Sequence, residues 1–289
     1  MIKMIKPIVN ISKVIEPYNT VIVGFNGVLT EGKGIKPETI DALIGMKRAG
    51  KHIILLSNIA WRTAHMVNYL HTNKVPLAVF DAVVTAGEIL HYKFKARQGE
   101  FAAIGTAYYK IGDSRDMGVF SYLDYQPVDN LNRADFIYMT EASKQSDIIE
   151  NYLPILEHAA SLGIPMVCAG NDTSSYKDGD ICLAPGAIAE QYAVLGGKII
   201  TVGKPDAKII AYALDGIPNV KKESVIIIGD NIATDIKGAN LLGVASVLVS
   251  KGVHVNFLGE GYIPDVAKTR ELAVNFDAYP DFVISNLRW

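Results

Sequence analysis

Four short apolar runs, each followed by a turn and a helical pattern, occupy the two ends of the sequence. These runs cover 21–25, 52–57, 224–229 and 245–250. Their Val, Ile and Leu content is typical of strands buried in a parallel sheet. Helical periodicity, with Pro in a first turn or Gly at an end, predicts helices over 37–49, 61–71, 205–214 and 234–242. The expected fold class is α/β, a Rossmann-like parallel sheet core with helices on both faces.

The middle of the chain repeats this alternation by itself. Its strand candidates are 109–113, 135–140 and 165–169. An amphipathic pattern predicts a long helix over 145–162, and a last apolar run at 281–285 would complete the outer sheet. We therefore predict a core formed by residues 1–86 and 199–289, with residues 87–198 as an inserted α/β cap domain.

Composition excludes several classes of function. The 289 residues are 49% hydrophobic and 20% charged, which is enough to bury two cores. The net charge of -2 gives no basic field for nucleic acid, and no run approaches the roughly 18 apolar residues of a membrane span. Lys and Pro interrupt the first segment, so we expect no signal peptide and a cytoplasmic protein. Cys168 and Cys182 are expected to be buried free thiols. A small molecule is then the expected partner.

The loops that follow the predicted strands carry polar groups suited to a phosphate and a metal. Carboxyl ends of parallel strands share one edge of a sheet, so these loops should converge. Asp230 directly follows a strand, where its carboxylate suits Mg²⁺, and Asp235 suits a role behind the metal ligands. The Ser57 hydroxyl, the loop amides and Lys204 are donors only, which complements a phosphate.

Each of these residues also has an ordinary structural explanation. Asp235 alone fits a carboxylate at a helix start, and Lys204 alone fits a solvated surface charge. The Ser57-Asn58 pair fits a turn or a cap. For Asp230 the functional interpretation is favoured, because a charged residue at the end of a buried strand has little structural reason to be there.

These segments, in this order, resemble the haloacid dehalogenase superfamily of phosphatases. The resemblance is to the class with a large α/β cap, which includes NagD-like and 4-nitrophenylphosphatase-like proteins, and it extends over nearly the whole chain. The segments are GFNGVLTEG, LLSNIAWRT, VGKPD and IIIGDNIATDIKGAN in the core, and AGNDTSSYKDGDICLAPGAIAE in the cap. The resemblance implies a hydrolase that acts on phosphorylated small molecules with Mg²⁺.

The first motif departs from the family pattern at its two catalytic positions. That pattern is Asp-x-Asp-Gly-x-Leu, in which the first Asp attacks phosphorus and ligates Mg²⁺ while the second is the general acid and base. Here Gly24 stands at the first position and Asn26 at the second, while Gly27 and Leu29 keep the shape of the loop. Asn26 still offers a backbone carbonyl to a metal but cannot transfer a proton at neutral pH.

The loss of a nucleophile is severe, on the order of 10⁶ in turnover. We therefore expect a weak or inactive phosphatase-like protein that binds a phosphorylated metabolite, with a weakened Mg²⁺ site at Asp230. Without an anion at position 24, the donors Ser57, Asn58, Lys204 and the Gly27 amide are expected to favour phosphate. In the cap, the resemblance places Asp172, Thr173, Ser174 and Ser175 on the substrate side.

Two other functions stay open at this stage. One is an active Mg²⁺-dependent phosphatase with a non-standard nucleophile or water, and the other is a non-catalytic scaffold whose cap mediates assembly. A homodimer is also left open. The segment GVLTEGKG matches most of a P-loop but has Gly34 where a Ser or Thr should hold Mg²⁺, so we treat that match as coincidence.

Overall fold

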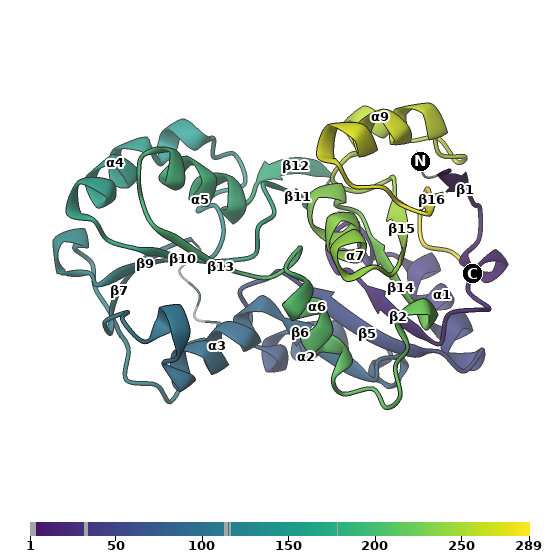
Figure 1. Cartoon of the computed structure of the whole chain (residues 1–289), viewed down its shortest axis with the longest axis horizontal. Coiled ribbons are helices and arrows are strands. Elements are labelled where there is room, and N and C mark those ends of the chain that lie inside the picture. Colours follow the sequence, from purple (N-terminus) through teal and green to yellow (C-terminus); the bar gives the residue numbers. More distant parts are fainter. Residues whose placement is uncertain (1–3, 32–33, 113–114, 116, 178) are drawn as a thin grey trace.

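The computed structural model describes residues 4–31, 34–112, 115, 117–177 and 179–289, and it contains two parallel sheets in separate lobes (Figure 1). The larger sheet has the order β1-β16-β15-β14-β2-β5-β6, and every neighbouring pair is parallel. Its strands are β1 (Lys6–Pro7), β2 (Thr20–Val23), β5 (His52–Ser57), β6 (Ala82–Thr85), β14 (Val225–Gly229), β15 (Ala245–Val249) and β16 (Phe282–Ile284). The predicted parallel core is confirmed.

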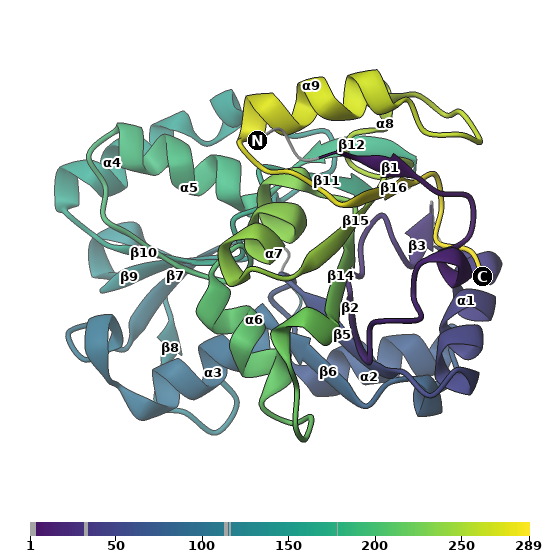
Figure 2. The ribbon, with the colours of Figure 1, turned by 45° about the vertical axis from the view of Figure 1, so that its right-hand side comes forward.

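Helices cover both faces of this sheet, because alternate strand residues bury their side chains on opposite sides. Val21 and Val23 pack with α1 (Pro37–Arg48) and α2 (Thr63–Thr72). Ile22 lies on the other face, in one apolar cluster with residues of α3 (Ala86–Ala96), α6 (Ala207–Leu214) and α7 (Lys237–Leu242). A third group, α8 (Val255–Leu258) and α9 (Val266–Phe276), lies near the β15–β16 edge (Figure 2).

The smaller sheet forms the second lobe and has the order β13-β10-β9-β7-β8, again parallel throughout. Its strands are β7 (Ala107–Ile111), β8 (Gln126–Pro127), β9 (Phe136–Met139), β10 (Met166–Ala169) and β13 (Ile199–Val202). Apolar residues from α4 (Leu153–Leu162) and α5 (Pro185–Val194) pack together with those of this sheet. This sheet, with the elements around it, is called the cap below. The limits drawn at 87 and 198 stay a prediction, and β13 lies just beyond the second of them.

Two hairpins lie where the lobes meet. The cap hairpin is formed by β11 (Ser174–Lys177) and β12 (Asp180–Leu183), and a smaller one is formed by β3 (Thr30–Glu31) and β4 (Gly34–Ile35). Strands β11 and β3 are in contact, and both views show β11–β12 at the junction (Figures 1 and 2). Short 3₁₀ turns cover Ile11–Lys13, Leu77–Val79, Gly99–Phe101, Leu131–Arg133, Ile149–Asn151 and Lys222–Ser224.

Several predicted boundaries need correction. The helix expected over 145–162 begins only at Leu153, because the Asn151 side chain accepts the Ile148 N–H and Pro154 suits a first turn. The helix expected over 234–242 is a π-helical turn, Ile232–Ile236, followed by α7. The strand expected over 109–113 is β7, which starts and ends two residues earlier, and residue 113 lies outside the described residues.

One apolar cluster continues from the core sheet into the cap. Phe94 on α3 is 1% exposed, and the rings of Phe101, Phe120 and Tyr125 lie within 5.1 Å of it, centroid to centroid. The same cluster includes Ile22 of the core sheet. The two lobes therefore share buried apolar surface. In the described part of the chain no helix is long and apolar enough to cross a membrane.

Phe94→Ala should lower the free energy of unfolding by about 3–5 kcal/mol, because it empties the centre of this aromatic cluster. Tyr92→Ala, on the exposed side of the same helix, is the matched control and should change it by no more than about 0.5 kcal/mol. Chemical denaturation of both variants measures the difference. Equal losses would contradict the central place of Phe94.

Candidate functional site

The carboxyl ends of the two parallel sheets face each other across a cavity of about 440 Å³. Predicted site residues from the core and the cap line it: Gly24, Asn26, Ser57, Asn58, Asp172, Ser174, Ser175, Lys204, Asp230 and Asp235. Gly27 and Thr173 were predicted in the same set but are not part of the lining. Most of the segments chosen from the sequence are therefore brought together in space.

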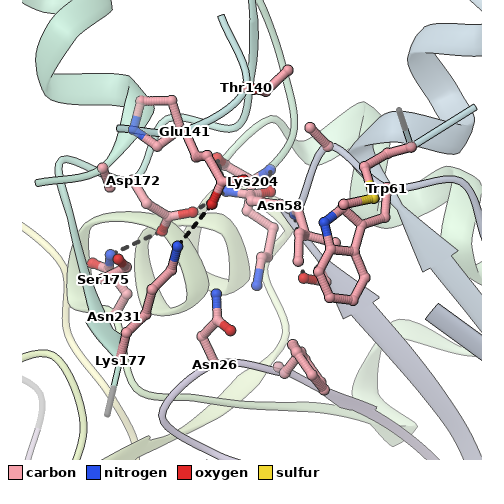
Figure 3. A pocket seen from close by; sticks show the side chains of 18 of the residues that line it. Asn26, Asn58, Trp61, Thr140, Glu141, Asp172, Ser175, Lys177, Lys204 and Asn231 are labelled. Carbon is pink, nitrogen blue, oxygen red and sulfur yellow. Dashed lines mark hydrogen bonds and ion pairs between the residues drawn. The ribbon is translucent and has the colours of Figure 1, made fainter. Parts of the chain in front are cut away.

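The loop after β2 begins at Gly24, and the structure has room for a β-carbon at this position. The Gly24 amide donates to the Ile228 carbonyl at 2.8 Å, which continues the pairing of β2 with β14. A β-carbon added at Gly24 would lie 3.5 Å from the Val28 side chain and 3.6 Å from Asp235 Oδ1, which are ordinary contact distances. Asn26 points its amide into the cavity below Lys177 and Lys204 (Figure 3). Position 24 therefore has room for a β-carbon.

Asp230 is held between two glycines. A β-carbon on Gly27 would lie 1.8 Å from Asp230 Oδ2, and one on Gly252 would lie 2.4 Å from the Asp230 β-carbon. The Val253 amide donates to Asp230 Oδ2 at 2.9 Å. Burial, followed by the nearby Asp235 carboxylate, raises the pKa of Asp230 to about 7. Gly27 therefore serves Asp230 in this structure, whereas the sequence assigned it to phosphate.

Lys204 is not a surface charge, because its side chain is buried and paired. Its Nζ donates to Asp235 Oδ1 at 2.6 Å and to the Leu56 carbonyl at 3.3 Å. Burial opposes the charge on Lys204, but the carboxylates of Asp235 and Asp172 outweigh burial and raise its pKa. The ammonium comes from the cap side, since Lys204 follows β13 of the smaller sheet.

The charges around Lys204 do not balance. Three carboxylates, those of Asp172, Asp230 and Asp235, act on this ammonium, which is a local formal excess of two negative charges. Elsewhere on the lining Lys110, Arg115, Lys177 and Glu141 bring the formal charges of the whole cavity into balance. We expected a phosphate to meet the donors without repulsion. The structure weakens this expectation, because the Lys204 ammonium is already paired with the Asp235 carboxylate. A divalent cation would compensate this excess.

The residues present could hold such a cation, but they supply fewer carboxylate ligands than the family pattern does. The raised pKa of Asp230 reflects negative charge that is poorly compensated at a buried position. Asp230 would hold the cation, and Gly24 offers no second carboxylate. Within the described residues, no group of three or more His, Cys, Asp or Glu side chains is arranged to hold a metal.

Asn58 and Asp172 connect the two sheets. Asn58 Oδ1 accepts the Lys204 amide N–H at 2.7 Å, and its Nδ2 donates to Asp172 Oδ2 at 2.8 Å. Asp172 Oδ1 also accepts from Asn231 Nδ2 at 2.9 Å and from the Thr234 hydroxyl at 2.7 Å. Asp172 thus contacts the core directly, which is a different use from the expected contact with a leaving group. Ser57 makes the local turn that was the alternative explanation for it, with its Oγ accepting the Ile59 N–H at 3.3 Å, and its contact with a phosphate stays a prediction.

Sequence reasoning missed several residues that shape the cavity. One wall is aromatic: the ring centroids of Phe25 and Trp61 each lie 5.6 Å from that of Tyr69. The roof carries an ion pair, Lys177 Nζ to Glu141 Oε2 at 2.9 Å (Figure 3). The aromatic residues lie within or near the first two motifs, so the sequence could have indicated them. The ion pair joins residues 36 positions apart, and no pattern in the sequence predicts it.

His254 supports the loop after β14 through its imidazole ring. Its Nε2 accepts the Ile232 N–H at 3.1 Å, so this nitrogen carries no proton. Burial lowers the pKa of His254 to about 4, although the Asp235 carboxylate acts in the opposite direction. In the folded protein the His254 imidazole is therefore neutral at neutral pH.

Comparison with known families agrees with this geometry. The profile of the haloacid dehalogenase-like hydrolases matches residues 18–243, which is most of the chain, and a second profile, HAD-hydrolase-like, matches residues 201–288. The chain belongs to the haloacid dehalogenase-like hydrolase family. The ribonucleotide monophosphatase NagD of Escherichia coli K12 is 28% identical over 244 residues, which cover 81% of this chain and 88% of NagD.

Solved structures show the same fold with its cap. A haloacid dehalogenase-like hydrolase from Brucella suis 1330 superimposes with a TM-score of 0.80 at 25% identity, covering 96% of this chain and 98% of the other. A possible sugar phosphatase from Cytophaga hutchinsonii gives 0.76 at 17% identity, covering 98% of both chains. The 4-nitrophenylphosphatase of Thermotoga maritima gives 0.65 at 22% identity, covering 94% and 96%. The resemblance to the NagD-like capped class is confirmed.

Two alanine substitutions in the first motif should differ sharply. Gly27→Ala should cost more than about 2 kcal/mol of unfolding free energy, because Gly27 has φ of +67° and its β-carbon would collide with Asp230. Gly24→Ala should change it by less than about 1 kcal/mol, because the added carbon meets ordinary contacts. Denaturant titration of the pair measures both, and a large loss for Gly24→Ala would contradict the intact space described above.

Acid should weaken this protein partly through His254. Its pKa is near 6.5 in the unfolded chain and about 4 in the folded one, so its contribution is complete above pH 6.5 and is lost as the pH falls towards 4. The loss amounts to about 3 kcal/mol. His254→Gln, which keeps an acceptor, should lose less stability between pH 7 and 4.5 than wild type. His158→Gln, exposed on α4, should follow the wild-type curve.

Proposed function

We propose that this protein binds a phosphorylated small molecule in the capped cavity together with Mg²⁺, and that it does not hydrolyse this molecule through the aspartyl route of its family. The observation that carries the proposal is the pairing of an intact cavity with an empty nucleophile position at Gly24. Glycine has no atom that can attack phosphorus, and Asn26 has no proton to transfer at neutral pH. The binding donors lie in place around that gap.

Binding in this proposal depends on the cation. Around Lys204, the carboxylates of Asp172, Asp230 and Asp235 outnumber the ammonium, so a phosphate placed there alone meets local negative charge. The cations Lys110, Arg115 and Lys177 lie elsewhere on the lining. Mg²⁺ at Asp230 would neutralise this local excess. The metal site is weaker than in an active relative, because position 24 supplies no carboxylate. NagD, a ribonucleotide monophosphatase, supports a phosphorylated small molecule as the ligand class.

Release of inorganic phosphate from ribonucleotide monophosphates, sugar phosphates and p-nitrophenyl phosphate tests the chemistry. We expect no Mg²⁺-dependent turnover from wild type and measurable turnover from Gly24→Asp/Asn26→Asp, because only the missing carboxylates are returned. Gly24→Asn/Asn26→Asp is the matched control, equal in size without a nucleophile, and should stay silent. Calorimetric titration with inorganic phosphate should show binding to wild type with Mg²⁺ and none without it.

Two results would redirect this proposal. Wild-type turnover that Asp230→Ala abolishes would establish an active phosphatase with a non-standard nucleophile or an activated water. Failure of wild type to bind phosphate, together with a silent Gly24→Asp/Asn26→Asp variant, would favour a non-catalytic scaffold.

A further inference from the structure

The cap supplies a carboxylate to the core side of the cavity. Asp172 follows β10 of the cap sheet, and its two oxygens accept hydrogen bonds from Asn58, Asn231 and Thr234, all of which belong to the core (Figure 3). The three donor–acceptor distances lie between 2.7 and 2.9 Å. Hydrogen bonds to a charged acceptor are stronger than those between neutral groups. Asp172 is therefore a strong local connection between the cap and the core.

The carboxylate also decides how two neighbouring amide groups are turned. A carboxylate accepts and never donates, so the NH₂ group of Asn58 must face it and Oδ1 must face away. Asn58 Oδ1 then accepts the Lys204 N–H. Asn231 is turned in the same way, with Nδ2 on Asp172 and Oδ1 accepting the Ala233 N–H at 3.0 Å.

Two glycines of the cap, Gly170 and Gly203, allow the backbone of the cap to approach Asn58 closely. A β-carbon on Gly203 would lie 2.5 Å from Asn58 Oδ1, and one on Gly170 would lie 2.7 Å from the Asn58 β-carbon. The Lys204 carbonyl accepts from Asn58 Nδ2 at 3.1 Å and from Asn171 Nδ2 at 3.2 Å. The Lys204 backbone is thus bound at its N–H by Asn58 and at its carbonyl by Asn58 and Asn171, and Asp172 sets the orientation of the Asn58 amide.

We propose that Asp172 is a positioning residue through which the cap builds the ligand site of the core. It sets the amides of Asn58 and Asn231, and through them it holds the Lys204 backbone and the loop after β14 in the arrangement that receives the ligand. This inference rests on the proposed function, in which that site binds phosphate with Mg²⁺. It gives Asp172 a role in forming the site and leaves recognition of the rest of the ligand to other cap residues.

A reciprocal exchange of the amide and the carboxylate tests the inference. Asp172→Asn places an amide between those of Asn58 and Asn231. Whichever way the new amide turns, its NH₂ group faces the NH₂ group of one of these two residues. Asn58→Asp places two carboxylates face to face. The double variant Asp172→Asn/Asn58→Asp recovers a donor–acceptor pair between the two positions and leaves Oδ1 of residue 58 free to accept the Lys204 N–H. It loses the bond to the Lys204 carbonyl, so recovery should be partial.

Two measurements on the full chain read the outcome. Calorimetric titration with inorganic phosphate in saturating Mg²⁺ should show about tenfold to hundredfold weaker binding for each single variant, and tighter binding for the double variant than for either. Hydrogen exchange of peptides covering Lys204 and residues 231–233 should be faster in the single variants and slower again in the double variant. Asp180→Asn makes the same chemical change at an exposed cap position and should match wild type in both measurements.

The two arms separate this inference from the function on which it rests. If wild type binds no phosphate with Mg²⁺, the proposed function fails, and hydrogen exchange alone decides the role of Asp172. Unchanged exchange around Lys204 in Asp172→Asn would overturn the inference whatever the binding shows. Additive losses in the double variant would also overturn it. A lower melting temperature with unchanged exchange and affinity would leave Asp172 a merely structural residue.

Discussion

The amide of Asn58 connects the two halves of this protein, and the geometry of the site depends on it. Asn58 follows β5 of the core sheet, yet its Oδ1 and Nδ2 bind the backbone of Lys204, which follows β13 of the cap sheet. That connection fixes the backbone from which the Lys204 side chain reaches Asp235. Gly170 and Gly203 permit the approach because any larger residue there would collide with Asn58.

Two parallel sheets that face each other by their carboxyl ends explain why so many loops reach one cavity. A single parallel sheet brings polar loops to one edge, and ligands bind in the crevice there. Here the second sheet closes that crevice from the opposite side and adds its own loops, which carry Asp172 after β10 and Lys204 after β13. The electrostatics follow, since carboxylates from both sheets meet around one ammonium in a buried space.

The sequence predicted the core sheet well, because its strands are buried on both faces and read as continuous apolar runs. It also located Asp230, Lys204 and Asn58 at the cavity. It failed where a side-chain contact, local or long-range, overrides the periodicity of the sequence. The side chain of Asn151 delays the start of α4, and Gly27 lies against Asp230, which no spacing rule indicates. The three core partners of Asp172 come from two separate segments, so only the folded chain reveals them.

Under the proposal that position 24 lacks the nucleophile of the family, the packing around Gly24 bears on what the site still does. A position that merely drifted after losing its role could be filled by its neighbours, since buried space without atoms forfeits dispersion contacts. Yet the surroundings of Gly24 accept a β-carbon at ordinary distances, and Lys204 is paired with Asp235. Buried charges of this kind are expensive unless each is paired or compensated. The proposed cation and anionic ligand would compensate the carboxylates of Asp172, Asp230 and Asp235 that lie around Lys204.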